Sequence, residues 1–273
     1  MAPHLQVPVV LTIAGSDCSA GAGAQADLKT FSALGVYGLT AITCVVAEVP
    51  GKVTSIQEIN SKNVQEQIEL SLANFPVAAI KTGLLRSRAI VEVVARVLLE
   101  HAAKSGRSLP LVIDPVMIAA SGDRLLQSDA IEAYERHLFP LASLVTPNLD
   151  EATVLLSETI TNLEGMRRAG ARLFAKYQVP FLLKGGHLSG DVAIDLLFER
   201  GRVSEFSTPF TRGVFTHGTG CTYSAAIAAN LARGSALSEA VQAAKAFVTD
   251  AIAEHFSWTI FPGADVHALN HLR

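Results

Sequence analysis

The residues Val7–Phe31, VPVVLTIAGSDCSAGAGAQADLKTF, decide the fold of this chain. They begin with an apolar run at Val7–Ala14, continue through a glycine-rich loop, and enter a helix expected to start near Gly23. A short run that is apolar at successive positions predicts a strand buried on both faces, which is typical of parallel sheets covered by helices. The stretch therefore indicates the first strand–loop–helix unit of an α/β fold.

Further units of the same kind follow along the chain. Apolar residues recur at helical spacing between the apolar runs, as at Ile90, Val94 and Val97. The other runs expected to form strands are Thr40–Ala47, Val77–Ile80, Leu109–Ile113, Ala142–Val145 and Pro180–Leu183. With right-handed crossovers, this order predicts a mostly parallel central sheet with helices on both faces.

The pattern changes toward the C-terminus. Asp191–Glu199 and Arg202–Thr208 predict a hairpin. Two helices are expected at about Thr219–Leu231 and Ser238–Ala253, and the first is dense in alanine and serine, which suits an interior helix. Because no linker, repeat or low-complexity segment separates these parts, we expect one domain over residues 1–273.

The composition argues against several classes of protein. The chain has 273 residues, is 49% hydrophobic and carries a formal net charge of -3, so it lacks the basic surface that nucleic-acid binding requires. No apolar segment is long enough to span a bilayer, and Met1–Pro8 has no secretory-signal pattern. Cys18, Cys44 and Cys221 lie far apart, which argues against a disulfide framework or a zinc site. We expect a globular cytoplasmic protein without a nucleic-acid or membrane partner.

Polar and glycine-rich segments follow the predicted strands. These segments are Gly15–Gly23, Lys81–Gly83, Asp114–Met117, Thr146–Glu151 and Lys184–His187. Ligands of open parallel sheets bind outside the carboxyl ends of the strands. Because all five segments belong to that edge of the sheet, they predict a single site.

One segment, Thr216–Thr222 (THGTGCT), is expected to open a helix. Backbone N–H groups at a helix N-terminus, made approachable by glycines, form an anion site that suits a phosphoryl group in transfer. Cys221 would lie in the first turn, where the helix dipole favours a thiolate able to accept a proton from a substrate hydroxyl. A buried structural cysteine is the alternative interpretation.

Charged and amide side chains follow two neighbouring strands. Asp114, Asn148 and Glu151 are candidates for a magnesium site, partly through water. Helix capping by Asn148, with Glu151 in the first turn, is the alternative, and the two roles are compatible. Lys184 is either a point charge for nucleotide phosphates or a solvated lysine at a turn. His217, like His187, has no partner at a recognisable spacing and is interpreted as a polar loop histidine.

Other nucleotide-binding patterns fit less well. Gly21, Gly23 and Ala26 match the dinucleotide fingerprint, and Glu48 stands near the position of a ribose-binding acid. That fingerprint needs its first glycine directly after the strand, whereas Gly15–Ala20 intervene here. The chain has no P-loop and no protein-kinase signature. The residues alone therefore indicate an α/β enzyme that handles a phosphate-bearing ligand.

Several motifs together resemble those of the hydroxymethylpyrimidine and hydroxymethylpyrimidine-phosphate kinases of thiamin biosynthesis. In the order and spacing of that family they are AGSD and GAGAQADLKTF within Ala14–Phe31, IDPVM in Ile113–Met117, TPNLDEA in Thr146–Ala152, LKGGH in Leu183–His187 and HGTGCTYSAAIAA in His217–Ala229. The resemblance implies a ribokinase-like three-layer sandwich that transfers the ATP γ-phosphate to a hydroxymethyl group, and often to the resulting monophosphate. It also implies Mg²⁺ as a cofactor and a homodimer.

The resemblance implies roles for particular residues as well. The implied residues are Gly218, Thr219 and Gly220 for the anion hole; Cys221 as the catalytic base; Lys184, Gly185 and Thr216 for ATP; Asp114 and Glu151 for Mg²⁺; and Gly15, Asp17, Gly21, Glu48, Leu84 and Val116 for the substrate.

Glu48 departs from the family pattern. The family usually has Gln-Asn-Thr at this point, and its Gln hydrogen-bonds the aminopyrimidine, whereas this chain has AEVP at 47–50. An ionised Glu only accepts hydrogen bonds, so a ring nitrogen would lose a donor unless it is itself protonated. An unpaired buried acceptor costs about 1–3 kcal/mol. Ala20 and Ala24 also replace the usual Gly and Ile, which slightly reshapes the loop and the helix.

Three alternative functions stay open. The first is a pyridoxal kinase of the same architecture, since pyridoxine-type rings also present a hydroxymethyl group. The second is an NAD-dependent oxidoreductase that uses Gly21–Ala26. The third is a non-catalytic vitamin-binding regulator on a kinase fold, against which the intact Gly218–Cys221 segment and Asp114 argue.

Overall fold

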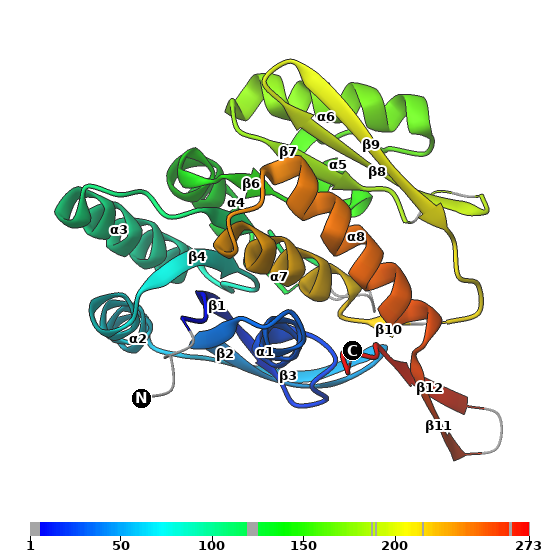
Figure 1. Cartoon of the computed structure of the whole chain (residues 1–273), viewed down its shortest axis with the longest axis horizontal. Coiled ribbons are helices and arrows are strands. Elements are labelled where there is room, and N and C mark those ends of the chain that lie inside the picture. Colours follow the sequence, from blue (N-terminus) through cyan, green and yellow to red (C-terminus); the bar gives the residue numbers. More distant parts are fainter. Residues whose placement is uncertain are drawn as a thin grey trace.

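The computed structural model of the chain (Figure 1) describes residues 6–118, 125–186, 188, 190–214, 216–261 and 264–272. In this part of the chain the centre is a nine-stranded sheet. In sheet order its strands are β3 (Lys52–Glu58), β2 (Tyr37–Val49), β1 (Val9–Asp17), β4 (Val77–Thr82), β5 (Leu111–Ile113), β6 (Leu144–Val145), β7 (Phe181–Lys184), β8 (Val192–Glu199) and β9 (Arg202–Pro209).

The pairing of these strands confirms a mostly parallel sheet. All pairs from β2 through β7 run parallel. Antiparallel pairs occur only toward the edges, where β3 pairs with β2, and β8 and β9 form the predicted hairpin beside β7. The sequence patterns missed β3, because its residues are mostly exposed or half-buried and form no apolar run.

Helices cover both faces of the sheet. Their bounds are α1 (Gly23–Ala33), α2 (Ser61–Asn74), α3 (Arg88–Ser105), α4 (Ala130–Ala133), α5 (Leu149–Leu156), α6 (Leu163–Tyr177), α7 (Thr219–Ala232) and α8 (Leu237–Ala253). A π-helical turn at Tyr134–Leu138 and a 3₁₀ turn at Phe139–Leu141 continue α4. No helix in the described ranges is long and apolar enough to cross a membrane.

Alternate residues of the central strands explain the three layers. On β1, Val10 packs with apolar residues of α1, α7 and α8, whereas Leu11 and Ile13 pack with those of α2, α3, α5 and α6. Successive strand side chains point to opposite faces, so a strand that is apolar throughout serves both layers. Figure 1 shows α7 and α8 side by side on one face, with α7 lying against the middle of the sheet.

The small residues of α7 fit this inner position. Ala225, Ala226, Ala228 and Ala229 are fully buried, as expected from the alanine-rich sequence. The short side chains let the helix lie close to the strands and to α8, which favours a tightly packed and rigid element. The N-terminus of α7 is thereby held firmly at the carboxyl edge of the sheet.

A second, three-stranded sheet near the C-terminus was not anticipated. It consists of β10 (Thr216–His217), β12 (Ala264–Ala268) and β11 (Phe256–Phe261), with β12 in the middle. Because β10 leads directly into α7, this sheet holds the chain immediately before that helix (Figure 1).

Candidate active site

A pocket of about 150 Å³ lies at the carboxyl ends of the central strands. The five polar segments expected at this edge all contribute to its wall. Predicted residues in the wall are Gly15, Asp17, Glu48, Leu84, Asp114, Val116, Glu151, Lys184, Gly218, Gly220 and Cys221. The prediction of a single rim is therefore confirmed, because parallel strands bring their ends to one edge.

The start of α7 forms one wall of the pocket. Gly218 precedes the helix with φ +84°, and a Cβ atom there would lie 1.8 Å from the carbonyl oxygen of Gly21. A Cβ on Gly220 would lie 3.1 Å from Nζ of Lys184. Glycine is required at Gly218, and the lack of a side chain at Gly220 leaves room in front of Lys184. Backbone N–H groups of the first turn are thereby left available to an anion.

Cys221 lies in the first turn of α7, as expected, and lines the pocket. Burial raises the pKa of its thiol to about 11; the Lys81 cation opposes this, whereas the Asp27 and Asp114 carboxylates add to it. The prediction that the helix end favours a thiolate is therefore wrong for this surrounding. Desolvation and the two carboxylates outweigh the dipole and the N–H of Gly23 that points to the sulfur.

Asp114 lies in a net of hydrogen bonds beside Lys184. Its Oδ1 is 3.0 Å from Nζ of Lys184 and accepts a hydrogen bond from Oγ1 of Thr146 at 3.3 Å. Its Oδ2 accepts one from Oγ of Ser224 at 3.2 Å. Lys184 is nearly buried and paired, so it is not a solvated lysine at a turn. The pocket thus holds a fixed positive charge beside the glycines of α7.

Glu151 caps the helix that it begins. Asn148 Oδ1 accepts from the backbone N–H of Glu151 at 2.8 Å, and Glu151 Oε2 accepts from that of Asn148 at 2.9 Å. Oε1 accepts from the backbone N–H of Met117 at 3.2 Å. Burial raises the pKa of Glu151 to about 7; Lys184 lowers it and Asp114 raises it. The capping interpretation is confirmed, and the carboxylate still lines the pocket.

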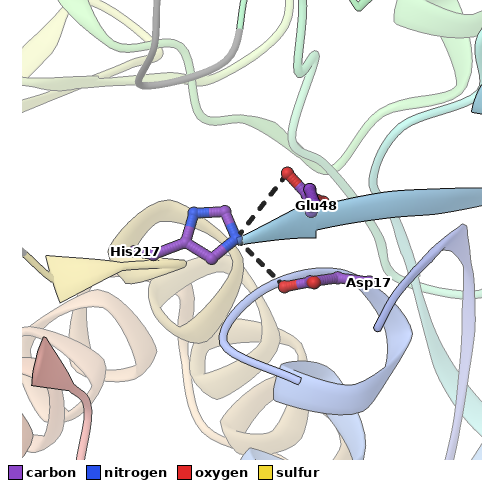
Figure 2. Close-up of side chains that lie close together, drawn as sticks. All are labelled: Asp17, Glu48 and His217. Atoms are coloured by element: carbon purple, nitrogen blue, oxygen red, sulfur yellow. Dashed lines mark hydrogen bonds and ion pairs between the residues drawn. The ribbon is translucent and has the colours of Figure 1, made fainter. Parts of the chain in front are cut away.

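Asp17, Glu48 and His217 meet at the other side of the pocket (Figure 2). Nε2 of His217 is 3.0 Å from Oδ2 of Asp17 and 3.9 Å from Oε2 of Glu48. Asp17 also accepts hydrogen bonds from the N–H and Oγ of Ser19 and from the N–H of Ala22. His217 is therefore an ion-pair partner in the pocket wall and not an ordinary loop histidine.

The three side chains set one another's charge. Burial opposes ionisation of Asp17, but its hydrogen bonds, first that from His217, lower its pKa to about 2. Burial lowers the pKa of His217, and the two carboxylates more than compensate, so that it is raised. Burial and the nearby Asp17 raise the pKa of Glu48, and His217 opposes them. The ligand atoms of the three lie within 4.8 Å of one another, a spacing open to a metal, but Oδ2 of Asp17 already has three hydrogen-bond partners.

Some predicted site residues lie elsewhere. Gly21 lines a neighbouring cavity between α1 and the small sheet. The N–H of Gly185 donates to Oδ1 of Asp195, and Thr219 is not part of the pocket wall. Thr216 is described only by its backbone in β10, and His187 lies outside the described residues.

The dinucleotide fingerprint is not supported by the geometry. β1 ends at Asp17, so Gly21 is not in a tight turn directly after the strand. A Cβ on Gly23 would instead lie 2.5 Å from the carbonyl oxygen of Gly15. Gly23 thus serves the close packing of this loop against the end of its own strand, whereas a Cβ on Gly21 would lie 2.9 Å from the ring of His217.

Lys81 begins the segment Lys81–Gly83 that was expected at the strand ends, but no role was predicted for it. It lies near the carboxyl end of β4, directly after the apolar residues Val77–Ile80, is fully buried and lines the pocket. A lysine within an apolar strand was the available signal, because an ammonium is rarely buried without a specific partner.

The chain is similar to known proteins over most of its length. The family described as phosphomethylpyrimidine kinase matches residues 17–263. A relative from Schizosaccharomyces pombe is 43% identical over 264 residues, which cover 90% of this chain and 47% of that one, so this chain spans about half of its length. The hydroxymethylpyrimidine/phosphomethylpyrimidine kinase of Streptomyces coelicolor is 41% identical over 254 residues. The match covers 93% of this chain and 92% of that one.

The fold has a close counterpart among solved structures. The ADP complex of Bacillus subtilis pyridoxal kinase superimposes with a TM-score of 0.85 at 34% identity, over 98% of this chain and 99% of that one. The three-layer architecture is therefore that of this group of vitamin kinases, as the motifs implied.

Proposed function

Since the chain belongs to the phosphomethylpyrimidine kinase family, we infer that its pocket transfers the γ-phosphate of ATP to the hydroxymethyl group of an aminopyrimidine, and to the monophosphate so formed. The observation that carries this inference is the convergence of Cys221, Lys184 and the glycines of α7 on one pocket. Together they offer a proton acceptor, a cation and an anion site, which are the groups that phosphoryl transfer needs.

Cys221 is the base in this proposal. The thiol first releases its proton to water, and the thiolate takes the proton of the substrate hydroxyl. The hydroxyl oxygen then forms a bond to the γ-phosphorus while the bond from that phosphorus to the ADP oxygen breaks. Backbone N–H groups at Gly218–Gly220 face the charge that spreads over the transferred group.

Lys184 and the start of α7 receive the nucleotide phosphates. Nζ of Lys184 lies beside Gly220, so an anion held by the helix N-terminus would also meet the ammonium. That arrangement is in keeping with ADP in the related Bacillus subtilis structure. Gly185 and Thr216 belong to the same proposal as neighbours of the phosphates, through their backbone.

Asp114 and Glu151 are the candidate ligands for a magnesium ion in this proposal. Both carboxylates are buried and line the pocket. Carboxylates suit a divalent cation, and Mg²⁺ in nucleotide sites is held by one or two of them, with waters and phosphate oxygens as its other ligands. Asp114 and Glu151 would hold the ion, which supplies neutralisation of phosphate charge when bound.

The substrate ring would lie between Gly15, Leu84 and Val116, with Glu48 and Asp17 at its polar edge. Pyridoxal is the second candidate substrate, and its supporting observation is the close structural likeness to a pyridoxal kinase. The cytoplasmic setting, the homodimer and the single domain remain predictions that accompany this function.

The first test of the reaction is ADP release with Mg-ATP on hydroxymethylpyrimidine, its monophosphate and pyridoxal in parallel. Turnover of both pyrimidines supports the proposed function. Turnover of pyridoxal alone would mean that pyridoxal is the substrate, while the proposed mechanism would stand. No ADP release with any of the three, although ATP binds, contradicts the proposal.

The role of Cys221 is tested by the change Cys221→Ala. We expect kcat to fall by about 100-fold or more, because general-base catalysis contributes on that order, while the dissociation constant for ATP stays within about twofold. Cys18→Ala is the control for loss of a cysteine outside the pocket wall, and it is expected to keep kcat. Because the Cys18 thiol hydrogen-bonds the backbone of Glu48, only kcat and ATP affinity are compared, and not KM for the ring. A kcat near that of the wild type in Cys221→Ala would remove this residue as the base.

A further inference from the structure

Two opposite charges lie beneath the pocket and have no part in the mechanism so far. Lys81 of β4 and Asp27 of α1 are both fully buried. Nζ of Lys81 lies 2.9 Å from Oδ1 and 2.8 Å from Oδ2 of Asp27. Oγ1 of Thr12, the register partner of Lys81 on β1, donates to Oδ2 of Asp27 at 2.6 Å. The three side chains, from two strands and a helix, form one hydrogen-bonded network.

Stability alone is a weak reason for such a pair. The desolvation of two buried charges roughly cancels or exceeds their attraction, and apolar residues of similar volume are often as stable or more so. The neighbours of Lys81 in its own layer of the strand, such as Ala79, are apolar and would accommodate an apolar side chain. A functional reason for the buried Lys81 ammonium is therefore to be sought in the groups that it faces.

Lys81 faces the pocket that contains Cys221. It forms part of the pocket wall, and a Cβ atom on Gly83 would lie 2.9 Å from its Nζ, so the absence of that atom opens the space in front of the ammonium. An ammonium has three N–H donors. Among the described residues two of them go to Asp27, which leaves one for the pocket side.

Four charged groups interact electrostatically with the Cys221 thiol. They are Lys81 on β4, Asp27 on α1, Asp114 directly after β5 and Lys184 on β7. Burial raises the pKa of the thiol and both carboxylates add to that rise, whereas Lys81 is the foremost opposing group. Lys81 is thus placed to compensate the negative charge that the proposed reaction puts on the sulfur.

We propose that Lys81 is a positioning residue for proton transfer: its ammonium, held by Asp27 and Thr12, stabilises the negative charge on the Cys221 sulfur. Asp27 keeps Lys81 protonated and fixes its direction, and Thr12 fixes Asp27. The inference rests on the proposed function in one respect, the role of Cys221 as the base.

The test measures the reactivity of Cys221 without turnover. We would follow alkylation by iodoacetamide at pH 8, using mass spectrometry of the peptide that contains Cys221, in the wild type and in Lys81→Met. Iodoacetamide reacts with the thiolate, so loss of the ammonium is expected to slow modification of Cys221 about tenfold or more. Cys18, exposed in the same protein, serves as an internal control and keeps its rate.

Three further variants keep the result interpretable. Lys81→Met leaves Asp27 buried without its cation, so the double variant Lys81→Met/Asp27→Asn removes both charges and is expected to fold. Because the Asp27 carboxylate raises the pKa of the thiol, the matched reference for the double variant is Asp27→Asn alone, and alkylation in the double variant is expected to be slower than in that single variant. Lys62→Met removes one positive charge from an exposed position on α2 and is expected to leave Cys221 unchanged. In the two Lys81 variants kcat is expected to fall about tenfold, with KM for ATP nearly constant.

The outcomes separate the two proposals. If Cys221 reacts as fast in Lys81→Met as in the wild type, or as fast in the double variant as in Asp27→Asn alone, the inference about Lys81 is overturned, whatever the kinase activity. If alkylation slows but Cys221→Ala retains full kcat, Lys81 does stabilise the thiolate and the assignment of Cys221 as the base fails.

Discussion

Single side chains in the pocket hold their charge states through partners that are distant in sequence. Asp17 and His217 are 200 positions apart and lie 3.0 Å from each other. Lys81 and Asp27 are 54 positions apart and form a fully buried pair. Cys221 shows the consequence most clearly, because burial and carboxylates, and not its helix, decide its ionisation.

Glu48→Gln tests how this chain tolerates a carboxyl where its family has an amide. A neutral carboxyl donates and accepts like an amide, whereas the ionised form only accepts. Because burial and Asp17 raise the pKa of Glu48, kcat/KM for the aminopyrimidine is expected to fall as pH rises through that pKa. The glutamine side chain of the variant does not ionise, so its kcat/KM for the aminopyrimidine is expected not to fall in this way. At pH 8 it is expected to be about tenfold higher than that of the wild type.

The measurement is kcat/KM for the aminopyrimidine and for pyridoxal between pH 5.5 and pH 8.5. Dividing the two values at each pH cancels the ionisation of Cys221 and other shared groups. Parallel ratios in the wild type and in Glu48→Gln would contradict a role of Glu48 in choosing the ring.

Among the elements, the join between β10 and α7 is the critical one. It brings His217 to Asp17, Gly218 to Gly21 and Cys221 to Gly23. The glycine-rich loop after β1 and the start of α7 thus form one unit, although they come from opposite ends of the chain.

Gly218→Ala tests the close contact within this unit. A Cβ there would lie 1.8 Å from the carbonyl oxygen of Gly21, so α7 or the loop must move, and kcat is expected to fall at least about 100-fold. Gly234→Ala at the other end of α7 is the matched control. Gly234 also has a positive φ, of +91°, but no atom within 4 Å of the added Cβ. It is expected to cost about 1 kcal/mol of stability and little activity.

Asp17→Asn tests the ion pair between the same two elements. The pKa of Asp17 is about 2 in the fold against 3.8 for the free group, so its stabilisation is complete above pH 4 and is lost as pH falls toward 2. The wild type is expected to be more stable than the variant by about 2 kcal/mol at pH 6. Urea unfolding at several pH values should show this difference shrinking below pH 4. A difference independent of pH would assign the effect to packing.

At the scale of the whole molecule, buried polar links tie the layers to the sheet. Lys245 of α8 donates to Oδ2 of Asp195 on β8 at 2.7 Å, and Oδ1 of Asp195 accepts from the N–H of Gly185 beside Lys184. The carboxylate of Asp195 therefore connects the helix α8, the central sheet and the loop that follows Lys184.

Lys245→Met tests that link. Removing one partner of a buried ion pair leaves an uncompensated charge, so the free energy of unfolding is expected to drop by about 3–5 kcal/mol. Arg167→Met is the control, because it breaks an exposed ion pair between Arg167 on α6 and Glu205 on β9. It is expected to lower the free energy of unfolding by at most about 1 kcal/mol. Urea denaturation of both variants compares them. Equal losses of unfolding free energy in the two variants would mean that the buried ion pair contributes no more than the exposed one.

Much of the fold follows from local patterns. Apolar runs such as the one in β1 predicted the parallel strands, and helical spacing of apolar residues predicted α3. These patterns depend only on residues that are close in sequence. The strand β3 was missed because its residues form no apolar run, and the small C-terminal sheet was missed because β10 and β12 pair across about 50 residues of sequence.

By itself the sequence determined the α/β class, the rim that carries the site, and the family to which its motifs belong. Only the tertiary structure decided which groups share that rim and in what charge state: His217 with Asp17 and Glu48, Lys81 with Asp27, and Cys221 as a thiol. The reason is physical. Strand and helix patterns act between near neighbours, whereas ionisation depends on burial and on charges that only the folded chain brings within a few ångströms.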